Sequence, residues 1–258
     1  MKFTLLGSGT STGVPLAGCQ CAICLSSNPK NFRNRTSATI EIESGPTILV
    51  DAGPDLRHQC ITHRIRRVDA VIYTHGHADH ILGTDDLRSF NFIGQKRIPC
   101  FGTKETLASI TRSFGYIFDP AEHYMGGMLP QLDLHEFCNA DLITIEGTPF
   151  QTFSLPHGNV SVTGLRVGDL AYLTDFKGLP AAAASHLQGL KHLFIDGLRF
   201  EPHNTHNTID EAIAIAQHLG AARTYIIHTT HTIDYDAVNP TLPSGIELGY
   251  DGLTIDFS

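Results

Sequence analysis

Short apolar or alternating segments recur along the chain, separated by residues that favour turns. Alternation of apolar and polar side chains is typical of a strand with one buried face, and a short continuous apolar run is typical of a fully buried strand. We therefore predict strands at residues 3–6, 39–43, 47–50, 68–74, 152–155, 160–167, 170–174, 192–195, 225–228 and 254–257.

Three longer segments between these strands have helical spacing, at residues 103–114, 180–187 and 208–219. Asn207 precedes the last of them as an expected N-cap, and Gly220 follows it as a stop signal. Strands followed by helices in both halves, without a linker rich in Pro or Ser, predict two packed sheets with helices outside them. We expect a single α/β domain of four αββα layers over residues 1–258.

Composition limits the kinds of partner. Hydrophobic residues make up 41% of the chain and charged residues 17%, which is typical of a compact globular protein. The formal net charge of -8 argues against extensive nucleic-acid binding, because such binding depends on Lys and Arg. We therefore do not expect a nucleic-acid partner, although a small anionic ligand in a local basic pocket is compatible with this charge.

The cysteines and the apolar runs predict a location. Three of the six cysteines crowd together and the other three stand alone, which favours a reducing compartment over a disulfide framework. Leu16-Ala17-Gly18-Cys19 imitates a lipoprotein cleavage site, but the polar, glycine-rich residues 7–13 interrupt the apolar segment that such a signal requires. No apolar run approaches the ~18 residues of a membrane span, so we expect a soluble, cytoplasmic protein without a membrane partner.

Histidine is unusually frequent, with fifteen residues. An apolar strand at residues 71–74 runs directly into His75-Gly76-His77-Ala78-Asp79-His80, which places four ligand-type side chains within six positions. Imidazole nitrogens and carboxylate oxygens are common ligands of Zn, Mn and Fe, and the small residues between them let the backbone fold closely around an ion. The segment therefore predicts a metal site at the carboxyl end of a strand.

This His-x-His-x-Asp-His segment resembles the signature of the metallo-β-lactamase superfamily. Further residues of the family motifs follow in the family order over nearly the whole chain. They are Asp51 after an apolar strand, His157 in Leu155-Pro156-His157-Gly158, Asp175 after Leu173-Thr174, and His228 after Ile226-Ile227. The resemblance implies a four-layer αββα metallo-β-lactamase fold and a metal-dependent hydrolase.

The resemblance also implies a role for each ligand. One metal ion is expected on His75, His77 and His157, a second on Asp79, His80 and His228, and Asp175 is expected to bridge the two. The two ions, Mn or Zn, would activate a shared water, Asp79 would take part in catalysis, and Asp51 would orient the metal loop. Seven other histidines have no such support and are expected to be ordinary residues: His58, His63, His123, His135, His186, His192 and His218.

Cys19-x-Cys21-x-x-Cys24 offers three thiolates within six residues, a spacing that favours a structural zinc site. The fourth ligand is expected to be His231, three residues after His228. A loop without metal, with redox-active cysteines, is the alternative.

Within the superfamily, the chain resembles the phosphodiesterases that open 5-phosphoribosyl 1,2-cyclic phosphate in the carbon-phosphorus lyase pathway of phosphonate metabolism. The similar segments are residues 5–11, 34–37, 83–91 and 204–212, together with the Cys loop. The last segment contains His206, which the resemblance implies as the acid that protonates the leaving ribose oxygen or stabilises the phosphorane. His203 is the weaker alternative, and both could instead only cap or decorate the loop.

The cyclic phosphate carries a second phosphate, which needs cationic donors. Arg33, Arg35 and Arg88 are the candidates, because a guanidinium can bind phosphate through two hydrogen bonds. The alternative for each of them is a solvated surface side chain.

Three other functions remain open at this stage. Residues 7–15 also resemble the opening of tRNA 3′-end endonucleases, although the chain has no evident basic arm to hold an RNA. Hydrolases of cofactor synthesis, of the pyrroloquinoline quinone type, share the Cys loop. A metal-binding or redox-sensing protein without hydrolysis is the non-enzyme alternative. The sequence leaves a homodimer open, and the expected partner is a small phosphodiester substrate.

Overall fold

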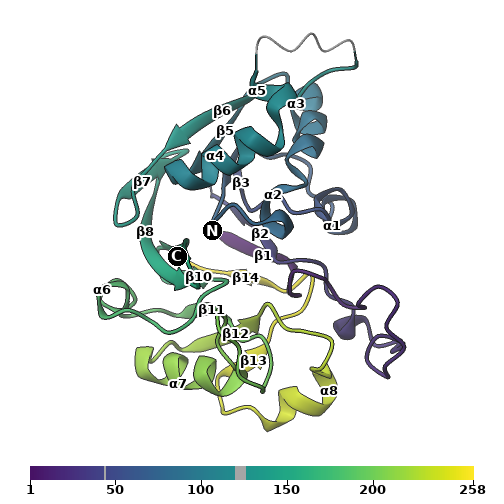
Figure 1. Cartoon of the computed structure of the whole chain (residues 1–258). Helices are drawn as coiled ribbons and strands as arrows, with labels where there is room; N and C mark the ends of the chain where they lie inside the picture. Colours follow the sequence, from purple (N-terminus) through teal and green to yellow (C-terminus); the bar gives the residue numbers. More distant parts are fainter. Residues whose placement is uncertain (44, 120–125) are drawn as a thin grey trace.

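Two β-sheets lie face to face and helices cover their outer faces, as Figure 1 shows. This computed structural model describes residues 1–43, 45–119 and 126–258. In the first sheet the spatial order is β14 (Thr254–Asp256), β1 (Lys2–Gly7), β2 (Ser37–Glu41), β3 (Thr47–Val50), β4 (Ala70–Ile72), β5 (Ile98–Gly102) and β6 (Leu132–Glu136). In the second sheet it is β13 (Ile246–Leu248), β12 (Arg223–Ile227), β11 (His192–Asp196), β10 (Leu170–Leu173), β9 (Val160–Val167), β8 (Thr148–His157) and β7 (Leu142–Ile145).

Both sheets mix strand directions in a way that positions the functional residues. Strands β3 and β4 pair in parallel, and so do β10, β11 and β12. The carboxyl ends of neighbouring parallel strands lie at the same edge of a sheet, where ligands bind in open α/β sheets. The loops that follow these strands therefore meet at one edge of the molecule.

Three apolar layers hold the sheets and helices together. The central layer joins side chains of both sheets, among them Phe3, Ile72, Tyr172 and Phe194. One outer layer packs α7 against the second sheet, and the other packs the first sheet against the helices between residues 56 and 118. The predicted αββα order of layers is confirmed.

The helices are short, and most lie between strands. They are α1 (Leu56–Thr62), α2 (Ala78–Ile81), α3 (Arg88–Gly94), α4 (Lys104–Ser113), α5 (Gly115–Phe118), α6 (Ala181–Ala184), α7 (Ile209–Leu219) and α8 (Tyr235–Val238), with 3-10 turns η1 (Pro29–Asn31), η2 (Thr84–Leu87) and η3 (Asn239–Thr241).

The start of α7 corrects one detail of the sequence prediction. Its N-cap is Thr208, not Asn207, because the Thr208 side chain accepts a hydrogen bond from the Glu211 backbone while the Glu211 carboxylate accepts one from the Thr208 backbone. The Asn207 amide instead donates to the Phe176 carbonyl, and its oxygen accepts from the Gly178 backbone. Gly220 ends the helix as predicted, with a φ of 66°.

All ten predicted strands are present to within a few residues, but β5, β6, β7 and β13 were not predicted. Pro99 interrupts the apolar pattern of β5, and exposed or half-buried polar residues dilute the pattern of β6 and β7. Helix α6 is also shorter than the predicted 180–187. In the described part of the chain no helix is long and apolar enough to span a membrane.

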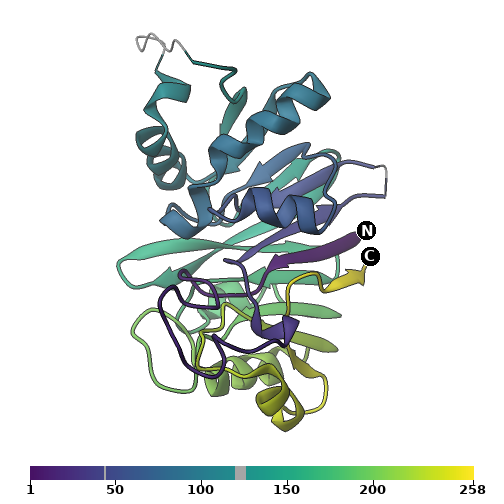
Figure 2. The same ribbon diagram turned by 90° about the vertical axis from the view of Figure 1, so that its right-hand side faces the viewer.

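The two ends of the chain lie side by side in one sheet, because β1 pairs with β14 (Figure 2). The apolar layer between the sheets contains residues from Phe3 to Phe257. On this basis we propose that residues 1–258 fold as one domain, as the sequence predicts.

Candidate metal centre

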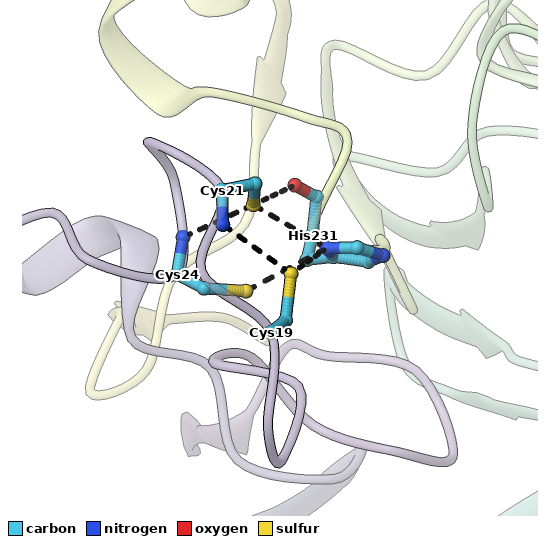
Figure 3. Close-up of side chains that lie close together, drawn as sticks. All are labelled: Cys19, Cys21, Cys24 and His231. Carbon is cyan, nitrogen blue, oxygen red and sulfur yellow. Dashed lines mark hydrogen bonds between the residues drawn. The ribbon is translucent and has the colours of Figure 1, made fainter.

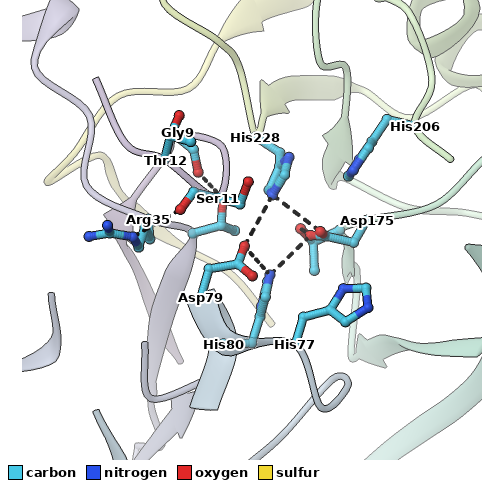
Figure 4. A network of polar contacts seen from close by, with 12 residues as sticks. Gly9, Ser11, Thr12, Arg35, His77, Asp79, His80, Asp175, His206 and His228 are labelled. Carbon is cyan, nitrogen blue, oxygen red and sulfur yellow. Dashed lines mark hydrogen bonds and ion pairs between the residues drawn. The ribbon is translucent and has the colours of Figure 1, made fainter. Parts of the chain in front are cut away.

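The ligand-type side chains predicted from the sequence converge at the shared edge of the two sheets (Figure 4). The His75–His80 segment follows β4, His157 ends β8, Asp175 follows β10 and His228 follows β12. Side chains at the ends of strands are held by the hydrogen-bonded sheet behind them, which fixes their positions. The seven predicted ligands form two adjoining groups: His75, His77 and His157, and Asp79, His80, Asp175 and His228.

In the first group, the rings of His75 and His157 are held from outside through Nδ1. His75 Nε2 lies 2.9 Å from His77 Nδ1. The outer nitrogen of His157, Nδ1, donates to the Thr205 carbonyl at 3.0 Å, and His75 Nδ1 lies 3.1 Å from Thr74 Oγ1. Such outer contacts fix the tautomer of a metal-binding histidine and leave its other nitrogen for the ion.

Asp175 connects this group with the second one. Its Oδ1 lies 3.3 Å from His80 Nε2, and its Oδ2 lies 3.2 Å from His228 Nε2 and 4.0 Å from His75 Nε2. Asp79 completes the second group, with Oδ2 3.2 Å from His80 Nε2. Ligand atoms arranged tetrahedrally around one ion at about 2.0–2.2 Å lie about 3.3–3.6 Å apart, so these separations suit a shared cation.

Asp51 supports the metal loop from beneath. It is fully buried, accepts hydrogen bonds from the backbone and hydroxyl of Thr74 at 2.7 and 2.8 Å, and accepts one from His80 Nδ1 at 2.7 Å. Burial raises the pKa of Asp51, against the opposing effect of His80. These contacts are those that the predicted orienting role requires.

The electrostatics of the centre fit divalent cations. Burial acts to raise the pKa of Asp175, but His228 and His80 outweigh it and hold that pKa well below its ordinary value. Burial acts to lower the pKa of His228, but Asp175 outweighs it and raises that pKa to about 10. The carboxylates therefore stabilise positive charge at this point. A bound cation would supply that charge in place of the protons on the imidazole nitrogens.

Hydrogen-bond accounting supports the same conclusion. Within the described residues, Asp79 Oδ2, His80 Nε2 and His228 Nε2 are buried side-chain atoms without a hydrogen-bond partner. Buried polar atoms are nearly always partnered, and an unpartnered group requires an explanation such as an ion. All three atoms belong to the second group, so the side chains present fit a metal ion.

Backbone conformation at the centre is unusual. Asp51, Asp175 and His228 have φ values of 62°, 53° and 62°, in the left-handed region that residues with a β-carbon rarely adopt. Such strain tends to occur at functional sites, where the surrounding structure enforces it. Gly53 serves the same tight packing, because a Cβ there would lie 2.1 Å from the Asp79 carbonyl oxygen.

His206 stands beside the seven predicted ligands, and it forms further potential ligand groups with His157 and Asp175 and with Asp196 and His228. Its ring centroid lies 4.8 Å from that of His157 and 4.8 Å from that of His228 (Figure 4). His206 Nδ1 donates to Asp196 Oδ2 at 2.9 Å, and Asp196 is fully buried at the end of β11. His203, the weaker candidate, has its Nδ1 within hydrogen-bond distance of both the Thr205 backbone and the Thr205 hydroxyl.

Asp196 is a residue that the sequence reasoning missed. It follows Leu193-Phe194-Ile195, so it has the same placement after an apolar strand as Asp51 and Asp175. This position directly after an apolar strand is the sequence feature from which Asp196 could have been predicted as a site residue. Besides His206, Asp196 Oδ1 lies 3.9 Å from His228 Nδ1, so one buried carboxylate faces both imidazoles.

The predicted Cys19, Cys21, Cys24 and His231 also come together, as Figure 3 shows. His231 Nδ1 lies 3.4, 3.5 and 3.6 Å from the three sulfur atoms in that order. Zn–S bonds of about 2.3 Å and a Zn–N bond of about 2.0–2.1 Å at tetrahedral angles separate sulfur from nitrogen by about 3.5 Å. The backbone N–H of Cys24, and then His231, lower the pKa of the Cys21 thiol to about 6, which favours the thiolate that binds metal.

The three arginines predicted to bind substrate phosphate differ in burial and in hydrogen bonds, and Arg33 is the most buried of them. Arg33 is 1% exposed, and its guanidinium donates to the carbonyls of Thr230 and Ile233 at 3.0 and 2.5 Å. The prediction that Arg33 binds substrate phosphate is therefore wrong, because a phosphate cannot reach donors that are buried and already used. Arg33 instead ties the N-terminal segment to residues 229–233.

Arg35 and Arg88 each have a carboxylate partner. Arg35 pairs with Asp55 at 2.9 Å, donates to the Ser11 carbonyl at 3.0 Å, and points away from the His and Asp side chains in Figure 4. Arg88 pairs with Asp85 at 3.1 Å. Neither presents a guanidinium free of protein partners.

Of the seven histidines expected to be ordinary, His123 lies outside the described residues, and the other six belong to none of the potential ligand groups among the described residues.

Residues 46–229 match the family described as the beta-lactamase superfamily domain, a match that spans well over half of the chain. The chain belongs to this family. The predicted metallo-β-lactamase fold is thereby confirmed, the domain is of the metal-dependent hydrolase type, and the fold implies divalent metal ions at the His and Asp cluster.

Individual relatives refine the comparison. A diphosphatase from the PhnP family is 40% identical to this chain, with a TM-score of 0.92 and coverage of 100% of this chain and 98% of that one. Zinc-bound PqqB from Methylobacterium extorquens is 20% identical with a TM-score of 0.81, covers 100% of both chains, and shows the fold alone.

One curated relative is longer. A Porphyromonas gingivalis (strain ATCC BAA-308 / W83) protein named octanoyltransferase is 35% identical over 98% of this chain but only 51% of its own length. The chain therefore spans about half the length of that relative, whose name describes a protein about twice as long.

Proposed function

We propose that this protein is a metal-dependent phosphodiesterase that hydrolyses a small cyclic phosphodiester, most specifically 5-phosphoribosyl 1,2-cyclic phosphate. The observation that carries the proposal is His206, an imidazole that is additional to the seven predicted ligands and that Asp196 holds with a ligand atom within 4.8 Å of those of His157 and Asp175. A cyclic ribose phosphate expels a poor leaving group, an alkoxide, and therefore needs an acid beside the metal centre. The 40% identity to a PhnP-family diphosphatase supports hydrolysis at a phosphorus centre.

The proposed ligands divide between two ions, manganese or zinc, as the sequence predicts. His75, His77 and His157 would hold one ion, Asp79, His80 and His228 the other, and Asp175 would bridge them. When bound, such ions lower the pKa of a water molecule toward neutrality and polarise a phosphoryl oxygen.

The chain's own residues supply the remaining steps. Asp51 fixes the His80 ring through Nδ1, so that Nε2 faces the centre. Asp79, buried among cationic partners, stays ionised because His80 and His228 hold its pKa below the ordinary value against the effect of burial. Asp196 directs the His206 ring through Nδ1 in the same way, so Nε2 is the atom that can donate a proton to the leaving oxygen.

Rival substrates receive less support. A tRNA precursor requires an extended basic surface, whereas this chain has a net charge of -8 and its candidate arginines are buried or paired. The likeness to PqqB concerns the fold at 20% identity. A non-catalytic metal-binding protein would have no need for His206 and Asp196 beside a complete set of ligands. We propose a small phosphodiester as partner, and neither nucleic acid nor a membrane.

The test is a substrate panel with purified, metal-loaded protein. We expect turnover of 5-phosphoribosyl 1,2-cyclic phosphate with a kcat/KM at least ~10²-fold above that for cyclic nucleotides, and no cleavage of a tRNA precursor. Preferential cleavage of the tRNA precursor, or no hydrolysis of any phosphodiester by protein with both ions bound, would overturn the proposal.

We further propose that Cys19, Cys21, Cys24 and His231 bind a structural zinc ion. The three sulfur–nitrogen distances of 3.4–3.6 Å around His231 support it. None of the six cysteines, all of which the structure describes, forms a disulfide, which supports a cytoplasmic location in reducing surroundings. A zinc ion here would join the N-terminal loop to the segment that follows His228.

Cys21→Ser is expected to lose one equivalent of zinc and to lower the free energy of unfolding by about 2 kcal/mol or more, because structural zinc contributes directly to folding. Intrinsic activity of the folded fraction should fall much less. Cys138→Ser, which changes an exposed cysteine, is the control and should lose neither zinc nor stability. Elemental analysis with urea unfolding makes the measurement, and unchanged zinc content in Cys21→Ser would refute the site.

A further inference from the structure

A cavity of about 650 Å³ adjoins the metal centre. His75 and His77 form part of its wall, and the rest comes from the start of α4, the end of β6 with the turn after it, and the hairpin of β8 and β9. Because two proposed metal ligands line the cavity, it offers space for the remaining part of a substrate whose reacting phosphate is bound at the metal centre.

The lining of the cavity is rich in groups that bind hydroxyls. Thr103, Thr106, Ser109, Ser154 and Ser161 contribute hydroxyls. Asn139 and Asn159 add amides. The hydroxyls of Thr103 and Thr106 bond to each other, and the Ser109 hydroxyl donates to the Glu105 carbonyl. Among the described residues of the lining, Ser154, Ser161 and Asn159 have side chains without such a bond, and these can donate to and accept from the hydroxyls of a sugar.

Lys104 is the one Lys or Arg among the described residues of this lining. Unlike Arg33, Arg35 and Arg88, it has no hydrogen bond or ion pair through its side chain with any other residue that the structure describes. Its ammonium sits on a flexible stem with three donors, so it can reach an anion inside the cavity without breaking a contact within the protein.

The acids in the lining restrict what this cation can accept. Glu105 and Glu136 also line the cavity, so its protein charge is not that of a site for several phosphates. Their carboxylates can accept hydrogen bonds from sugar hydroxyls and would repel an anion placed near them. A single phosphate group at Lys104, joined to a hydroxylated sugar, matches this mixture.

We propose that this cavity binds the sugar-phosphate part of the substrate and that Lys104 binds its non-reacting phosphate. This inference rests on the proposed function and adds to it the cavity and the residue that bind the terminal phosphate of the proposed substrate. Lys104 then takes the role that was predicted from the sequence for Arg33, Arg35 and Arg88.

Paired substrates test the inference. For Lys104→Ala we expect kcat/KM on 5-phosphoribosyl 1,2-cyclic phosphate to fall about 10-fold or more, the usual effect of losing a charge-assisted hydrogen bond. On ribosyl 1,2-cyclic phosphate, which lacks the terminal phosphate, the change should stay below about 2-fold. Lys191→Ala, an exposed lysine paired with Asp169, is the control and should change neither value.

Equal losses on both substrates, or no loss on either, would overturn the role of Lys104 while leaving the proposed function intact. If the wild-type protein hydrolyses neither substrate, the proposed function fails, and binding then decides the inference. Ribose 5-phosphate, measured by calorimetry, should bind Lys104→Ala about 10-fold or more weakly than wild type. Equal affinity for the two proteins would reject the cavity as a sugar-phosphate site.

Discussion

Asp175→Ala is expected to lower the turnover of every phosphodiester by ~10³-fold or more. Asp175 is the carboxylate that connects the two ligand groups, with one oxygen 3.3 Å from His80 and the other 3.2 Å from His228. It also fixes the positive charge of the centre, because it raises the pKa of His228 to about 10 against the effect of burial. Its removal therefore deprives both groups of a shared ligand.

The measurement is steady-state kinetics together with elemental analysis of bound metal. Asp175→Ala should keep its circular dichroism spectrum and lose at least one equivalent of the exchangeable ions. Asp169→Ala is the matched control, because Asp169 precedes β10 whereas Asp175 follows it, and it contacts Lys191 and Ser258. The control should retain both metal and turnover. Undiminished turnover by a folded, metal-loaded Asp175→Ala protein would disprove the bridging role.

His206→Ala is expected to keep both ions and to lose ~10²-fold or more in kcat on the cyclic sugar phosphate. His206 Nδ1 is committed to Asp196, and a ligand atom of His206 lies within 4.8 Å of those of His157 and Asp175. Retained metal content in the variant is therefore the result that assigns His206 as an acid and not as a ligand. The loss should be smaller on bis(4-nitrophenyl) phosphate, because a nitrophenolate leaves without needing a proton, whereas a ribose alkoxide requires one.

His203→Ala serves as the control on the same loop and should change kcat less than ~3-fold, because its Nδ1 bonds to Thr205 and its ring meets His206 only in a tilted contact with centroids 5.1 Å apart. Equal defects of His206→Ala on both substrates would favour stabilisation of the phosphorane over protonation of the leaving oxygen. Full activity of His206→Ala on both substrates, with full metal content, would refute a catalytic role and leave His206 as a structural residue of the loop.

The fold and most of the candidate site could be predicted from the sequence because their signals are local. An apolar strand followed by a ligand-type residue occurs at Asp51, His75, Asp175 and His228, and the structure brings these four residues together. The Cys loop and His231 were likewise visible as residue types at a characteristic spacing. Strands β5 and β6 were missed because a proline and charged residues weaken the apolar pattern on which the prediction depends.

Only the tertiary structure decided which polar residues face the site. Nothing local distinguishes Arg33, which is buried with its donors used by backbone carbonyls, from Lys104, which lines the cavity beside His77. Asp196 acquires its place through a loop that folds back over ten residues to present His206 to it. The left-handed φ values of Asp51, Asp175 and His228 are enforced by the surrounding packing. The sequence thus determined the ligand types and their order, whereas burial and long-range contacts determined which charges are available to a substrate.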